Sequence, residues 1–183
     1  MPDTTVLERY QNFRTRRFLR NEERYRHWLP RWRTRRRRRL LVVVLAVILT
    51  CMAAVGGVCL VDMTAGALLW VPAVAVFLVT WTTLQIVSGR QGDAPRDALD
   101  EWELQQRDSA RSIGLTVTQV LTFLPAAVLV VTGSRVGAVV DTRFLYAAGL
   151  FVLTTLIVGA CTPAMILAWT RPDPETDDRQ ETE

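Results

Sequence analysis

The sequence predicts an all-α, polytopic membrane protein with four transmembrane helices, a basic amphipathic N-terminal segment and a cytoplasmic helical extension of the third span. Half of its 183 residues are hydrophobic and 22% are charged, yet the two kinds are segregated along the chain. Nearly all the charge lies between or outside four long apolar blocks. A soluble domain instead disperses its apolar residues at helix or strand periods. The segregation therefore indicates that the bilayer is the solvent.

The four apolar blocks are long enough for the hydrocarbon core, which is about 30 Å thick and needs roughly 20 apolar residues in a helix. Lipid offers no partner to unpaired backbone groups, so each block is expected to be fully helical. The continuous apolar runs also lack the two-residue alternation of barrel strands. The predicted spans are residues 40–61, 65–87, 113–133 and 144–170.

Arginine gives the predicted orientation, because the cytoplasmic segments of membrane proteins carry an excess of basic residues. All 22 residues counted as lysine or arginine are arginines. With a cytoplasmic N-terminus, the inner segments 1–39, 88–112 and 171–183 hold fourteen, four and two of them. The outer segments hold Arg135 and Arg143. The sequence thus predicts a multi-pass plasma-membrane protein with both termini in the cytoplasm.

The basic N-terminal segment, residues 1–39, also contains many aromatic residues. Read as a helix, it places most of its apolar side chains, Trp28 and Trp32 among them, within one broad arc, although Pro30 must end or kink that helix. The pattern is typical of a basic amphipathic helix on the inner leaflet, where anionic headgroups contribute about 1 kcal/mol per nearby arginine. The residues predicted to contact lipid or a partner are these two tryptophans and the run Arg35, Arg36, Arg37, Arg38 and Arg39.

Three roles are open for this arginine run. It can serve only to set the topology, it can recognise anionic phospholipid, or it can bind nucleic acid. Nucleic acid is the disfavoured partner, because tethering at the membrane and competition from phospholipid both act against it. The expected partners are therefore the bilayer and its anionic phospholipids, with a protein partner or a second copy of the chain beside them.

The segments around the third span differ in character. Residues 88–96 contain glycine and proline and are typical of a flexible link. From residue 98 the pattern predicts a helix that runs unbroken into the third span, with acids first and arginines later, as the helix dipole favours. The tail, residues 171–183, has six acids and no apolar residue, and is expected to be disordered.

The predicted spans contain no charged residue, but neutral polar residues gather in them. The hypothesis is a polar intramembrane cluster in the inner halves of spans two and three, formed by Thr82, Gln85, Thr118, Gln119 and Thr122. The cluster either hydrogen-bonds across helices, at about 0.6 kcal/mol per bond, or lines a small polar vestibule; packing is the favoured interpretation. Pumps and proton-coupled carriers usually place ionisable groups near the midplane. The absence of charged residues from the predicted spans therefore argues against this chain alone being such a pump or carrier.

No catalytic signature occurs in the sequence: it has no phosphate loop, nucleophile elbow, HExxH or dinucleotide fingerprint. An enzyme is therefore not expected, and no cofactor is implied. Cys51, Cys59 and Cys161 lie inside apolar blocks and form no CxxC pair, so no metal site is predicted. Two spacings, Ala53-x-x-x-Gly57 in the first block and Gly159-x-x-x-Pro163 in the fourth, offer small surfaces for close helix contact. Asp62, between the first two blocks, is a candidate cap for the second helix.

The stretch Leu99–Ile113 (LDEWELQQRDSARSI), together with the lysine-free basic leader, resembles uncharacterised small four-span integral membrane proteins of actinobacteria. The resemblance covers about fifteen residues and the overall layout. It implies a plasma-membrane location and no particular activity. From the residues themselves, the leading hypothesis is a structural or regulatory membrane subunit that acts through protein or anionic-lipid contacts. The alternative is a small channel or transporter component.

Overall fold

The computed structural model of the chain describes residue 13 and residues 34–88, 101–134 and 141–170. This part of the chain contains four long helices: α2 (Arg35–Val58), α3 (Met63–Val87), α4 (Glu101–Gly133) and α5 (Thr142–Thr170). Each of them is long and apolar enough to cross a membrane. The predicted all-α class with four membrane spans is therefore confirmed, and the helices are those of a multi-pass membrane protein.

Some predictions fall outside the described residues. They are the amphipathic N-terminal segment with Trp28 and Trp32, the link at 89–96, the start of the helical extension at residue 98, and the tail at 171–183.

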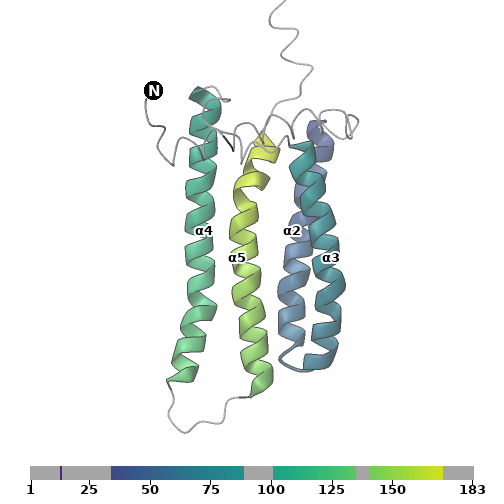
Figure 1. Ribbon diagram of the computed structural model, residues 1–183, viewed down its shortest axis with the longest axis vertical. Coiled ribbons are helices and arrows are strands. Elements are labelled where there is room, and N and C mark those ends of the chain that lie inside the picture. Colours follow the sequence, from purple (N-terminus) through teal and green to yellow (C-terminus); the bar gives the residue numbers. More distant parts are fainter. Residues whose placement is uncertain (1–12, 14–33, 89–100, 135–140, 171–183) are drawn as a thin grey trace, which may run out of the picture.

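The helices run alternately in opposite directions, so the starts of α2 and α4 lie at the same end of the molecule as the ends of α3 and α5 (Figure 1). We call this end the arginine end, because Arg35–Arg39 begin α2 there. Helix α5 lies between α4 on one side and the α2–α3 pair on the other (Figure 1), and it packs against both α4 and α2. Helix α3 packs mainly along α2. Thus α5 joins the two halves of the molecule.

The core lies among α2, α3 and α5. Leu45 and Met52 on α2 and Leu84 on α3 have no exposed surface. They belong to one cluster that also includes Cys161 and Ala168 of α5. Helix α4 adds little to this core, since its buried residues are limited to Arg107, Ala110 and Gly114. Most apolar side chains of α4 therefore lie on the outside, as expected of an edge helix that faces lipid.

The helix boundaries differ from the predicted spans mainly in the first helix. Helix α2 begins at Arg35 rather than at Leu40, because arginine is a good helix former and the run simply extends the apolar helix. It ends at Val58 rather than at Val61, because the chain turns there before α3 begins. The predicted extension of the third span is confirmed from Glu101 onward, since α4 continues without a break to Gly133.

Asp62 caps the start of α3, as the sequence indicated. Its Oδ1 accepts hydrogen bonds from the backbone N–H groups of Thr64 at 2.9 Å and Ala65 at 3.1 Å. Asp62→Ala removes both bonds, so we expect it to lower the free energy of unfolding by about 1 kcal/mol. Denaturant unfolding of the purified chain in detergent micelles measures the change. Asp62→Asn keeps a capping oxygen and should stay near wild type; equal losses in both variants would contradict the capping role.

Candidate functional site at the arginine end

The five arginines of the run are not equivalent once they are placed on α2. Arg38 is 2% exposed, whereas Arg39 is half-buried and Arg36 is exposed. Helical spacing explains the difference, because Arg38 precedes the buried residues Leu41 and Leu45 on the same face of α2. In the sequence the five residues look alike. The helical phase of α2 turns Arg38 and Arg39 toward the protein.

Arg39 joins the start of α2 to the end of α5. Its guanidinium carbon lies 4.9 Å from the ring centroid of Trp169. Such cation–π contacts contribute about 0.5–1 kcal/mol at exposed sites, and the Trp169 side chain is 41% exposed. Arg39 Nε is buried and has no hydrogen-bond acceptor within the described part of the chain. The contact therefore holds a positive charge in a fixed place on the ring.

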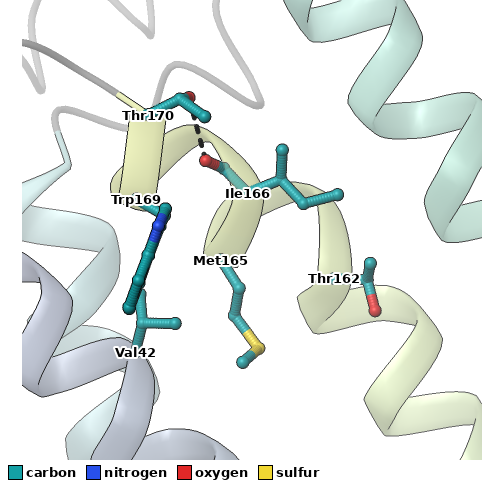
Figure 2. A pocket seen from close by; sticks show the side chains of 6 residues that line it. All are labelled: Val42, Thr162, Met165, Ile166, Trp169 and Thr170. Atoms are coloured by element: carbon teal, nitrogen blue, oxygen red, sulfur yellow. Dashed lines mark hydrogen bonds between the residues drawn. The ribbon is translucent and has the colours of Figure 1, made fainter.

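Trp169 also lines an apolar groove of about 310 Å³ between α2 and α5 (Figure 2). Figure 2 shows its ring alongside Val42 of α2, with Met165 one turn earlier on α5. The groove is lined by Val42, Thr162, Met165, Ile166, Trp169 and Thr170. The hydroxyls of the two threonines are already used: Thr162 donates to the Val158 carbonyl at 2.8 Å and Thr170 to the Ile166 carbonyl at 2.9 Å. The groove thus presents an apolar surface.

The predicted extension of the third span contacts the arginine end. Gln106 Nε2 on α4 donates a hydrogen bond to Thr170 Oγ1 at 2.7 Å. One residue later, Arg107 is 3% exposed, and its Nε lies 3.4 Å from Asp108 Oδ1. The first turns of α4 are therefore packed against the end of α5. Sequence reasoning missed the contact between Gln106 and Thr170, because nothing in the local pattern pairs these two residues.

The predicted polar intramembrane cluster is divided between two pairs of helices. Thr82 and Gln85 lie on α3, which packs mainly along α2. Thr118, Gln119 and Thr122 lie on α4, which packs against α5. Because α5 lies between these two groups (Figure 1), the structure does not bring them together. Thr82 and Gln119 are also exposed, so neither is enclosed by the helices.

Two members of that cluster lie in the contact between α4 and α5. Thr122 Oγ1 donates to Thr155 Oγ1 across the two helices at 3.1 Å. Thr118 Oγ1 donates to the Gly114 carbonyl at 2.7 Å, and its side chain occupies the place that a Cβ on Gly159 would need. These hydroxyls therefore serve hydrogen bonding within α4 and between α4 and α5.

The same contact brings small residues of both helices together. A Cβ on Gly114 would lie 2.6 Å from Pro163 Cγ, and one on Gly159 would lie 2.6 Å from Thr118 Cβ. Small residues let membrane helices approach closely enough for backbone packing. The prediction that Gly159-x-x-x-Pro163 supports close helix contact is confirmed, with α4 as the partner helix. At Gly57, in contrast, a Cβ would meet nothing within 4 Å, so Ala53-x-x-x-Gly57 shows no such close approach there.

Trp28 and Trp32 lie outside the described residues. Cys59 and Cys161 are buried and Cys51 is exposed, all with free thiols. In the part of the chain that the structure describes, no group of three His, Cys, Asp or Glu side chains could hold a metal ion. Comparison with family models, curated proteins and solved structures found no match for this chain.

Proposed function

We propose that this membrane protein is a structural or regulatory subunit that acts through contacts of its arginine end with anionic phospholipid or with a protein partner. The observation that carries the proposal is the arginine run at the start of α2, in which Arg39 is held on the Trp169 ring. In the proposed arrangement, the arginine end lies at the cytoplasmic face of the plasma membrane, and both termini are cytoplasmic. The distribution of arginines along the sequence supports this orientation.

The chemistry of the arginine end suits this role. Guanidinium groups stay charged in any environment and bind phosphate and carboxylate oxygens in pairs. Arg36 and Arg37 are exposed on the first turn of α2, next to apolar residues suited to the hydrocarbon. They are therefore placed where a headgroup or an acidic segment of a partner could meet them. No catalytic step and no cofactor is part of the proposal.

The alternative, a small channel or transporter component, has less support. Its sequence basis is the Thr/Gln cluster, whose α3 and α4 members lie on different pairs of helices. The hydroxyls of Thr118 and Thr122 are also engaged with Gly114 and Thr155. A polar pathway would need such groups to face a common space, so packing remains the better interpretation.

Purification of the tagged full-length chain from its native membrane in mild detergent tests the proposal. We expect anionic phospholipid or a defined protein to co-purify, as measured by mass spectrometry of both fractions. A double variant, Arg36→Gln with Arg37→Gln, should retain severalfold less of that partner. A matched double variant in the tail, Arg171→Gln with Arg179→Gln, removes the same charge and should behave like wild type. Wild-type protein that retains neither kind of partner would overturn the proposal.

A further inference from the structure

We infer that the groove between α2 and α5 and the adjacent Arg39 form a binding site for one anionic phospholipid, with an acyl chain in the groove and the headgroup phosphate on the guanidinium. The inference rests on the proposed function and names a ligand and a place for it. The evidence for it is that one side chain takes part in both halves of the site. Trp169 lines the groove, and its ring also lies under the guanidinium of Arg39.

The apolar half of the site suits a single alkyl chain. Its volume of about 310 Å³ lies at the lower limit of ligand pockets, which span about 300–1,000 Å³. Val42, Met165 and Ile166 supply apolar walls, and the threonine hydroxyls donate to carbonyls of their own helix. Apart from the indole N–H of Trp169, the side chains that line the groove offer a polar ligand no unused donor. A hydrocarbon chain requires none.

The charged half of the site suits a phosphate. No carboxylate pairs with Arg39 among the described residues, and its contact there is the Trp169 ring. The guanidinium and the groove share the Trp169 ring, so one side chain separates the charge from the apolar surface. A phosphate diester has one negative charge and two free oxygens, which match the paired donors of arginine.

The position of the site along the helices agrees with a lipid. Arg39 is the last arginine before the uninterrupted apolar stretch of α2, and Trp169 is next to the last residue of α5. Tryptophan favours the boundary between hydrocarbon and headgroups. A phospholipid changes from apolar to charged at this same boundary. Free phosphate would use Arg39 alone, and a neutral apolar molecule would use the groove alone, whereas an anionic phospholipid uses both.

Tryptophan quenching by brominated lipid tests the site in the full-length chain. The protein is reconstituted in phosphatidylcholine vesicles in which a fixed fraction of lipid is brominated near the top of one acyl chain. That lipid is either phosphatidylglycerol or phosphatidylcholine. The difference in quenching between each protein and its Trp169→Phe counterpart reports lipid at Trp169. We expect brominated phosphatidylglycerol to be preferred there, and Arg39→Gln to reduce the preference about fivefold.

Two further variants separate the site from general electrostatic attraction. Arg111→Gln removes the same charge from an exposed side chain of α4, and should leave the preference at Trp169 near that of wild type. Ile166→Phe fills the groove without changing any charge and should reduce quenching of Trp169 by both brominated lipids. Each variant is first shown to be helical and monodisperse by circular dichroism and size-exclusion chromatography.

The outcomes distinguish this inference from the proposed function on which it rests. Equal losses in Arg111→Gln and Arg39→Gln would overturn the site but leave a diffuse anionic-lipid contact in place. Unchanged quenching in Ile166→Phe would likewise overturn the placement of the acyl chain in the groove. A wild-type chain with no preference for phosphatidylglycerol at Trp169, and none in the co-purified lipid, would remove both the site and the lipid part of the proposed function.

Discussion

Replacing Leu45 with alanine is expected to lower the free energy of unfolding by about 2–5 kcal/mol. Leu45 on α2 has no exposed surface and lies in the cluster formed by α2, α3 and α5. Lipid tails are as apolar as leucine, so burial among helices brings little hydrophobic gain inside a bilayer. The expected loss therefore reflects the cavity and the missing dispersion contacts that follow when the helices relax only in part.

A leucine on the same helix provides the control for this experiment. Leu40 is 56% exposed and is not part of the buried cluster formed by α2, α3 and α5. Leu40→Ala should therefore change stability by no more than about 0.5 kcal/mol. Both variants can be unfolded by titrating sodium dodecyl sulfate into mixed micelles and following far-UV circular dichroism. If Leu40→Ala cost as much as Leu45→Ala, the described core among α2, α3 and α5 would be wrong.

The sequence alone predicts which residues lie within the hydrocarbon and which lie outside it, because the bilayer restricts the composition of the segments that cross it. Moving a charged side chain into hydrocarbon costs several kcal/mol. The uncharged blocks therefore mark the four spans, and the arginine run marks where the first begins. Asp62 was also readable as a cap, because a capping side chain acts on N–H groups two and three residues away. Both inferences depend on neighbours along the chain.

The rotation of each helix and its neighbours could not be read in the same way. When a helix is apolar on every side, its sequence shows no contrast between a polar and an apolar face, so it does not indicate which face is buried. Thr82 and Thr118 therefore look like members of one cluster at similar depth, although they lie on different helix pairs. The contact of Arg39 with Trp169 joins residues that are far apart in the chain. It depends on how α2 is turned against α5, which the local sequence does not specify.

Gly159→Ala is expected to lower the free energy of unfolding by about 1–3 kcal/mol through overpacking of α4 against α5. The added methyl group would collide with the side chain of Thr118 and would lie 2.8 Å from its Cα. A backbone atom cannot move aside as a flexible side chain can, so α4 itself must shift. The same detergent titration measures the loss of stability.

Gly149 on the same helix supplies the control, because a Cβ there would meet nothing within 4 Å. Alanine is the better helix former by about 0.5–1 kcal/mol, so Gly149→Ala should be neutral or stabilising, opposite in sign to Gly159→Ala. A stabilising Gly159→Ala would contradict the close approach of α4 and α5.

The polar residues on α4 serve either helix packing or a polar vestibule, and a double-mutant cycle of Gly159→Ala with Thr118→Ala distinguishes the two. Thr118→Ala removes the hydroxyl and methyl groups that meet the new side chain, so the double variant should lose less stability than the sum of the two single variants. Thr118 Cβ remains 2.6 Å from the added methyl group, so recovery should be partial. If Thr118 instead bordered a water-filled vestibule, the methyl group would enter free space and the two effects would add. Non-additivity therefore assigns Thr118 to helix packing.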